Sequence, residues 1–108
     1  MNITEETTDW GTVYHYKDDN CRFALYAYND DRNTMYLSNV KVNQSARGNG
    51  LGNRILTIAN EEAKKHGYTV ICLKVLKSSL VHGWYENHGY SDMCYDEDNN
   101  YIWMKHEL

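Results

Sequence analysis

The stretch from Val40 to Leu76 changes its hydrophobic period twice, and this change constrains the fold more than any other feature. This stretch begins at the end of Thr34–Val42 ("TMYLSNVKV"), a segment typical of a strand because it is rich in β-branched and aromatic side chains. Apolar residues then recur at helical spacing, at Leu51, Ile55, Ile58, Ala59 and Ala63, and Gly67 suits the end of that helix. The apolar run Tyr68–Leu76 follows and is typical of a strand covered on both faces. Strand, helix and strand in this order predict a right-handed crossover between parallel strands.

The segments on either side of this crossover are typical of antiparallel hairpins. Thr12–Tyr16 and Cys21–Tyr28 precede it, and short polar clusters separate these strands from each other and from the next. Near the C-terminus, "YSDMCY" and "YIWMKHEL" flank the polar "DEDNN", after a second helix expected from about Ser79 to His88. We therefore expect an α/β (α+β) fold in one domain over residues 1–108. It has a mixed, mostly antiparallel sheet, a central β-α-β crossover and two main helices.

Composition excludes several classes of function. The 108 residues carry 11 Lys and Arg against 15 Asp and Glu, a net charge of −4 that disfavours nucleic acid as a partner. We expect no membrane span, since no run of about 18 apolar residues occurs. The polar start is unlike a signal peptide, which favours a cytoplasmic location. The three cysteines lack a CxxC pair, so we expect free thiols and no metal site.

The stretch "ARGNGLG", Ala46 to Gly52, lies between the central strand and its helix. A glycine-rich turn at this place presents unpaired backbone N–H groups at a helix N-terminus, which is a site for phosphate. Arg47 can add a bidentate contact, and the turn differs from a Walker loop because Asn53, not Lys, follows Gly52. The alternative is a tight turn that binds nothing.

The chain resembles the GNAT superfamily of acetyl-CoA-dependent N-acetyltransferases. The family's pyrophosphate motif, Arg/Gln-x-x-Gly-x-Gly/Ala, is matched by Arg47, Gly50 and Gly52. A second signature, Tyr-Glu-x-x-Gly-Phe/Tyr, is matched within "WYENHGY" with Tyr85 at its tyrosine, and "WMKHEL" is loosely similar to the family's closing strand. This resemblance covers about Thr34 to Leu108 and implies an enzyme that takes acetyl-CoA as its cofactor.

The resemblance also implies which residues hold the cofactor. Acetyl-CoA is expected between two strands that splay apart, with backbone groups of Asn39 to Val42 as partners for its pantetheine arm. A backbone N–H near Val40 to Val42 is expected to polarise its thioester carbonyl. The pyrophosphate is expected on Arg47 and the amides of the turn, which are Gly48, Asn49, Gly50, Leu51, Gly52 and Asn53. Ser78 or Ser79 takes the place of a family asparagine that contacts the pantetheine arm, although either serine also suits a helix N-cap. Tyr85 is expected to protonate the leaving thiolate, against the alternative of a packing aromatic.

The acceptor side is less determined. Since Thr34–Val42 contains no carboxylate, the general base stays open among water, backbone carbonyls and side chains such as Tyr36, Ser38, His15 and His82. The family's usual N-terminal strand and helices are missing, which predicts an open acceptor site unless a partner, for example in a homodimer, closes it. An open site slightly favours a protein lysine or N-terminus over a small amine. Four aromatic residues are candidates to line it: Trp10, Tyr14, Tyr26 and Tyr28. The alternative function is a non-catalytic CoA-binding or interaction module.

Overall fold

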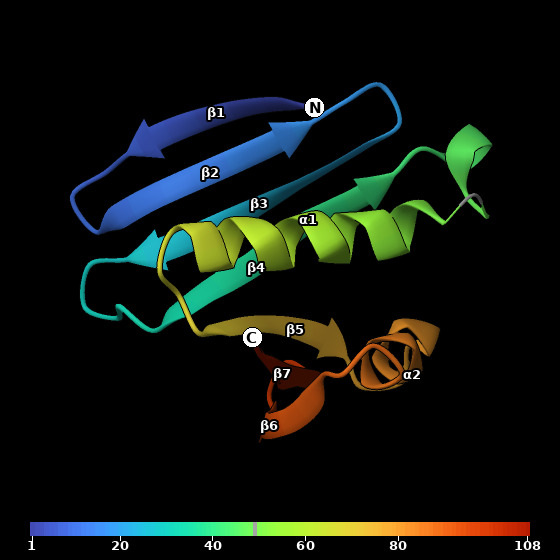
Figure 1. Ribbon diagram of the computed structural model, residues 1–108. Helices are drawn as coiled ribbons and strands as arrows, with labels where there is room; N and C mark the ends of the chain where they lie inside the picture. Colours follow the sequence, from blue (N-terminus) through green and yellow to red (C-terminus); the bar gives the residue numbers. More distant parts are fainter. Residues whose placement is uncertain (49) are drawn as a thin grey trace.

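The computed structural model describes residues 1–48 and 50–108, in which one seven-stranded sheet carries two α-helices (Figure 1). The strand order across the sheet is β1-β2-β3-β4-β5-β7-β6. The pair β4–β5 is parallel and every other pair is antiparallel, so the predicted mixed sheet is confirmed. The strands are β1 (Asn2–Thr7), β2 (Gly11–Lys17), β3 (Cys21–Tyr28), β4 (Thr34–Val42), β5 (Val70–Leu76), β6 (Ser91–Asp96) and β7 (Tyr101–Glu107).

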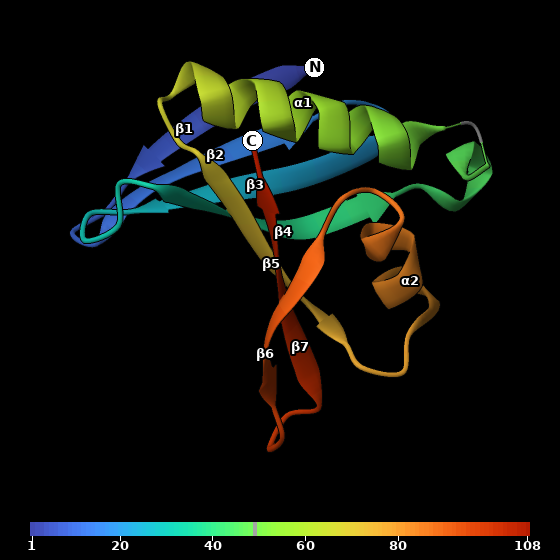
Figure 2. The ribbon, with the colours of Figure 1, turned by 60° about the horizontal axis from the view of Figure 1, so that its bottom comes forward.

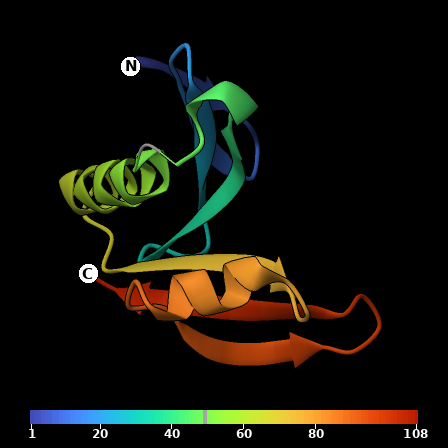
Figure 3. The same ribbon diagram turned by 90° about the vertical axis from the view of Figure 1, so that its right-hand side faces the viewer.

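The two helices begin close to the residues that the sequence predicts. Helix α1 (Leu51–Lys65) connects β4 to β5 and buries three residues of the predicted stripe, Ile55, Ala59 and Ala63. Leu56 is buried as well although the stripe did not include it, and the predicted Leu51 and Ile58 are only half-buried. A short 3-10 helix, η1 (Gln44–Ala46), lies between β4 and the glycine turn. Helix α2 (Leu80–Glu86) is shorter than expected. Figure 3 shows that the sheet turns sharply between β4 and β5, so α1 and α2 lie against different parts of it.

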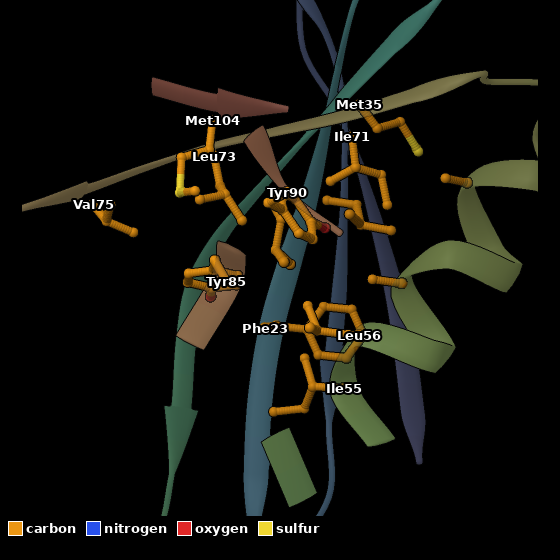
Figure 4. Packing of buried hydrophobic residues seen from close by; sticks show 14 of the residues in the cluster. Phe23, Met35, Ile55, Leu56, Ile71, Leu73, Val75, Tyr85, Tyr90 and Met104 are labelled. Atoms are coloured by element: carbon orange, nitrogen blue, oxygen red, sulfur yellow. The ribbon is translucent and has the colours of Figure 1, made fainter. Parts of the chain in front are cut away.

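One hydrophobic core joins both helices to the sheet (Figure 4). Ile55 and Leu56 of α1 and Tyr85 of α2 belong to the same cluster as Phe23, Leu73 and Tyr90. Full burial of one such large side chain contributes roughly 1.5–3 kcal/mol relative to exposure. Both helices therefore cover one face of the sheet. The opposite face carries neither α1 nor α2 and is called here the helix-free face.

Two expectations about strands need correction. The N-terminal strand that we expected to be missing is present: the segment forms β1, paired with β2 from Asn2↔Lys17 to Thr7↔Thr12. All of its residues are exposed, so it lacks the apolar alternation by which a half-buried strand is found. Strand β5 is not covered on both faces, because Lys74 and Leu76 are exposed on the helix-free face.

A bulge interrupts β4 near its end. Arg22 pairs with Lys41 and Ala24 pairs with Ser38, so Phe23 alone faces two residues of β4, Asn39 and Val40. Asn39 has a φ of 56°, a left-handed conformation that asparagine tolerates better than most residues. The bulge shifts the alternation by one residue and brings Val42 onto the core side, where it packs against the buried cluster.

In the part of the chain that the structure describes, no helix is long and apolar enough to cross a membrane. The three cysteines are free, as expected, with Cys21 and Cys72 buried and Cys94 exposed.

Candidate functional site

The site begins where β4 and β5 separate. These strands pair through Thr34↔Val70, Met35↔Ile71 and Tyr36↔Cys72, and among the described residues no further pair follows. Both strands continue beyond this point, to Val42 and Leu76, and Figure 2 shows their ends pointing apart with α2 beside the opening. The predicted splay is therefore present. The edge of β4 that faces β5 has no strand partner from Leu37 onward, so its main-chain groups can pair with an extended ligand.

The glycine turn lies at the far end of this opening, between η1 and α1. Gly48 and Gly50 have φ values of 85° and 74°, a left-handed conformation that glycine adopts without the strain of a Cβ. A Cβ built on either would meet nothing within 4 Å, so the space beside both is open. Within the described part of the chain, the N–H groups of Gly48, Gly50, Leu51 and Gly52 have no hydrogen-bond acceptor. Four free donors at a helix N-terminus attract an anion.

Gly52 also has a packing role that the sequence did not predict. A Cβ here would lie 3.0 Å from Cζ2 of the Trp84 indole, and the expected contact of Gly52 with a pyrophosphate stays a prediction. Glycine at this position therefore lets α2 pack against the first turn of α1. A ligand at the turn would meet the indole of Trp84 as one wall of the site.

His88 connects α2 to the first turn of α1 through two hydrogen bonds. Its Nδ1 lies 2.7 Å from the carbonyl oxygen of Trp84, and its Nε2 lies 2.5 Å from Oδ1 of Asn53. The imidazole also packs on the Trp84 ring, with 4.2 Å between ring centroids. The side chain of Asn53, expected to line the cofactor site, thus links α1 to the residues after α2. This contact fixes the first turn of α1 relative to α2.

A cavity of about 310 Å³ lies over the turn and is called here the turn cavity. Arg47 lies at its wall, where its Nε is 3.4 Å from the carbonyl oxygen of Val42 and donates to it. Its terminal NH₂ groups have no partner among the described residues, so they are available to a phosphate. The cavity is lined by Val42, Arg47, Gly48, Gly50, Leu51, Gly52, Asn53 and Trp84. All of these residues except Trp84, seven in number, are expected cofactor contacts. Asn49, another expected contact, lies outside the described residues.

Tyr85 occupies the core between the splayed strands and α1. It is 7% exposed and belongs to the same cluster as Leu37 and Leu73, the first residues beyond the last β4–β5 pair. Burial raises the pKa of its hydroxyl above the ordinary value, so the group is protonated at neutral pH. In the described residues this hydroxyl makes no hydrogen bond, and its proton is free for a ligand. The ring also packs edge-on against Trp84 and Tyr90, so the packing alternative is part of its role.

The two serines before α2 have different surroundings. Ser79 is the N-cap, and its Oγ accepts a hydrogen bond of 3.1 Å from the backbone N–H of Val81. Ser78 is exposed in the turn before it. Ser79 therefore performs the capping role that the sequence left open, and the expected cofactor contact of either serine stays a prediction.

A second cavity, of about 190 Å³, opens at the same splay and is called here the through-sheet cavity. It is lined by Tyr26, Tyr28, Tyr36, Leu37, Ser38, Leu73, Lys74 and Trp103. Leu37 and Leu73 belong to the core under the helices, whereas Tyr36, Ser38 and Lys74 alternate with them and belong to the helix-free face. Because residues from both faces line one space, the sheet is open at this point.

The candidate acceptor-side residues divide into two groups. Tyr26, Tyr28, Tyr36 and Ser38 line the through-sheet cavity, and Trp10 stacks beside it on Tyr26 and Tyr28. The remaining candidates lie elsewhere. Tyr14 packs on His66 at the end of α1, His15 lies 3.5 Å from Glu6 of β1, and His82 joins α2 to β6 at 2.8 Å from Asp92.

Sequence reasoning missed three contributors to the site: Trp84, His88 and Trp103. Trp84 and His88 stand inside the recognised "WYENHGY" motif, so their spacing from Tyr85 was a usable signal. Trp103 reaches the cavity through the pairing Lys74↔Trp103, which connects segments far apart in the sequence. No local sequence pattern predicts that contact.

Comparisons with known proteins agree with this geometry. A family model described as an acetyltransferase (GNAT) domain matches residues 9–92. No curated protein sequence was found to match the chain.

Solved structures with the same fold include three that are described as acetyltransferases. A GNAT family acetyltransferase from Elizabethkingia anophelis with acetyl-CoA bound has a TM-score of 0.75 and 16% identity, over 99% of this chain and 97% of that one. A Bacillus subtilis acetyltransferase in complex with CoA has a TM-score of 0.75 and 20% identity over the same shares. The ribosomal-protein-S18-alanine N-acetyltransferase from Escherichia coli has a TM-score of 0.71 and 18% identity, over 94% of this chain and 72% of that one.

Proposed function

Because the chain belongs to the GNAT acetyltransferase family, we propose that it transfers an acetyl group from acetyl-CoA to a primary amine. The observation that carries this proposal is the alignment of three features along one opening: the free amides of the turn, the unpaired edge of β4 and the through-sheet cavity. A long ligand with a diphosphate at one end and a reactive group at the other fits this order. In the proposal, residues 1–108 act as one acetyltransferase domain.

The residues of the turn cavity hold the phosphates. The N–H groups of Gly48, Gly50, Leu51 and Gly52 donate to phosphate oxygens, and the dipole of α1 adds positive potential. The two terminal NH₂ groups of Arg47 supply further donors, and the hydrogen bond from its Nε to the carbonyl oxygen of Val42 orients the guanidinium. The pantetheine arm pairs with the unpaired main-chain groups of β4, and a backbone N–H of Val40 or Val42 polarises the thioester carbonyl. Ser78 or Ser79 adds a hydroxyl beside this arm.

Bound acetyl-CoA supplies an acetyl group held as a thioester, whose carbonyl carbon a neutral amine can attack. A C–N bond forms, the C–S bond breaks, the amine loses a proton and the departing sulfur takes one up. Tyr85 Oη holds that second proton, since burial keeps the hydroxyl protonated well above the pKa of about 8.5 of an ordinary thiol.

The amine reaches the acetyl group through the opening in the sheet. Tyr36 and Ser38 supply the hydroxyl groups of β4 at this opening, and either can pass the amine's proton to solvent. Lys74 also lies at its wall. A positive charge beside an amine disfavours the protonated form, which supports the neutral nucleophile that the reaction needs. Amines of peptides and of small molecules both undergo this reaction, and the sequence slightly favours a peptide lysine or N-terminus.

Release of free thiol from acetyl-CoA tests the proposal directly. The assay uses the full chain with a panel of small primary amines and lysine-containing peptides, and mass spectrometry of the acceptor identifies the product. We expect amine-dependent thiol release with one acetyl group added to the acceptor. Tight binding of acetyl-CoA without release for any amine would instead identify the chain as a CoA-binding module.

A further inference from the structure

The helix-free face carries a continuous row of aromatic side chains, Trp10, Tyr28, Tyr36 and Trp103, called here the aromatic row. The ring centroids of Trp10 and Tyr28 are 5.2 Å apart, those of Tyr28 and Tyr36 are 5.3 Å apart, and those of Tyr36 and Trp103 are 6.2 Å apart. These distances and the edge-on angles of the last two pairs are those of interacting aromatic rings. The row crosses the sheet from the loop before β2 to β7.

Three of the four residues of the aromatic row line the through-sheet cavity. Tyr28, Tyr36 and Trp103 are lining residues, and Tyr26 completes the aromatic wall. The floor is formed by Leu37 and Leu73, at the place where β4 and β5 separate. A molecule in this cavity is therefore enclosed by rings at its outer end and meets the splayed strands at its inner end.

The size of the cavity limits its occupant. At about 190 Å³ it is smaller than the 300 Å³ or more of a typical site for a drug-sized ligand. One aromatic ring with a short chain fits such a space, and a folded protein surface cannot enter it. With the ring at the outer end of the cavity, the end of the short chain lies at the inner end, beside the splay of β4 and β5.

The charge of Lys74 disfavours a second cationic group among the outer rings of the cavity. Nζ of Lys74 lies 4.9 Å from the ring centroid of Tyr101 and 5.7 Å from that of Trp103, so an ammonium already occupies the cation position over these rings. A second ammonium beside it is repelled. A neutral aromatic ring, in contrast, gains edge and face contacts with Tyr28, Tyr36 and Trp103 at no electrostatic cost.

We propose that the acceptor is a small arylalkylamine, a primary amine joined to one aromatic ring through about two carbon atoms. This inference rests on the proposed function, because it assigns the substrate class of that reaction. The ring lies among the aromatic row, and the amine points toward Leu37 and Leu73. The amine nitrogen gains the acetyl group and loses one proton, while the thiol of CoA is released with one proton.

A matched set of acceptors tests the assignment. Phenethylamine is compared with cyclohexylethylamine, which has a similar size and no π system, with hexylamine, and with a lysine peptide that lacks aromatic residues. We expect kcat/KM for phenethylamine to exceed that for cyclohexylethylamine about three- to tenfold, the effect of one or two aromatic contacts. Equal values for these two amines, or higher values for the peptide, would overturn the inference while leaving the transferase function in place.

Variants locate the effect in the cavity. Trp103→Leu and Tyr28→Leu should each bring the ratio of the two kcat/KM values close to one. Tyr95→Leu is the control, because Tyr95 is an exposed tyrosine of β6 that does not line this cavity. A ratio lowered equally by Tyr95→Leu would contradict the assignment. Two wall variants are used so that a folding defect in one, detected by circular dichroism, leaves the other informative.

A binding measurement separates this inference from the proposed function. Tryptophan fluorescence is titrated with phenethylamine in the presence of CoA, where no transfer takes place. Quenching in the wild type that is lost in Trp103→Leu and kept in Tyr95→Leu supports the cavity assignment even if every amine fails in the transfer assay. Absence of any saturable quenching, together with transfer to all amines alike, refutes the arylalkylamine class.

Discussion

Tyr85 and Tyr90 belong to one core but differ in what their hydroxyl groups can do. Tyr85 lies beside the splay of β4 and β5, and its proton is free for a ligand, as described above. Tyr90 is also buried, and among the described residues its hydroxyl is an unpaired buried group. The first is the expected proton donor, and the second has no such task in the proposed mechanism. At the scale of single residues, we therefore expect Tyr85→Phe to lower activity and Tyr90→Phe to raise stability.

Replacing Tyr85 with Phe removes the proton donor and keeps the packed ring. We expect kcat to fall by roughly 10²-fold, a common contribution of a general acid, while the Kd of acetyl-CoA changes little. In the wild type, burial raises the pKa of Tyr85, so the donor should cause no loss of kcat below about pH 10. Steady-state rates between pH 6 and 10 check both points. An unchanged kcat in Tyr85→Phe would assign the residue to packing alone.

Replacing Tyr90 with Phe removes a buried hydroxyl that lacks a partner. Because an unpaired buried polar group costs roughly 1–3 kcal/mol, Tyr90→Phe should raise the free energy of unfolding by about 1 kcal/mol. Tyr16→Phe is the matched change, since the hydroxyl of Tyr16 donates to Oε2 of Glu62 at 3.4 Å. This second variant should lose up to about 1 kcal/mol. Urea unfolding of both variants measures the difference, and destabilisation by Tyr90→Phe would show that its hydroxyl is paired in solution.

At the scale of elements, α1 has a left-handed glycine at each end, and only one end faces the site. Gly50 has a φ of 74° and Gly67 a φ of 86°, and a Cβ on either would meet nothing within 4 Å. Changing either to Ala should cost about 1–2 kcal/mol of stability through backbone strain. Only Gly50→Ala places a methyl group where the phosphates are expected.

Binding therefore separates the two glycines although stability does not. We expect Gly50→Ala to raise the Kd of acetyl-CoA at least about fivefold, equivalent to roughly 1 kcal/mol of lost phosphate contact. Gly67→Ala should leave this Kd unchanged. Isothermal titration calorimetry gives both values. Equal Kd values for the two variants would indicate that the turn is a plain connection without a ligand.

The elements found from sequence are those with a local pattern. The apolar stripe of α1, the glycine turn and the hairpin strands each follow from residues close together in the chain, and all are present in the structure. Strand β1 was missed because it is exposed on both faces and has no alternation to detect. The bulge was missed because a lone asparagine with positive φ, Asn39, has no distinctive sequence context.

The candidate site was predictable only where its residues lie close together in the sequence. The turn cavity is built largely from consecutive residues, so the motif predicted most of its lining. The through-sheet cavity is built from four strands, and the meeting of Tyr36 with Trp103 depends on the order of β4, β5 and β7. Tertiary pairing of this kind cannot be inferred from a single local pattern.

At the scale of the whole molecule, the buried tyrosines make stability depend on high pH. Burial raises the pKa of Tyr85 and Tyr90 in the folded state, whereas both have a pKa near 10 when unfolded. Below about pH 10 both states keep these protons, so the tyrosines add no pH dependence. Above it the unfolded state loses them first, and stability falls by up to about 1.4 kcal/mol per pH unit for each tyrosine. Urea unfolding between pH 8 and 11 checks this, and Tyr90→Phe should reduce the slope.

The central claim for the whole molecule is that acetyl-CoA spans the opening from the glycine turn to the gap in the sheet. Two-dimensional ¹⁵N–¹H NMR of the full chain, titrated with CoA, tests it most directly because it reports on each backbone amide. We predict that the largest shifts occur at Gly48, Gly50, Leu51 and Gly52, with a second group at Leu37 to Val42. Saturable shifts confined to other surfaces, or none at these amides at saturating CoA, would contradict the account.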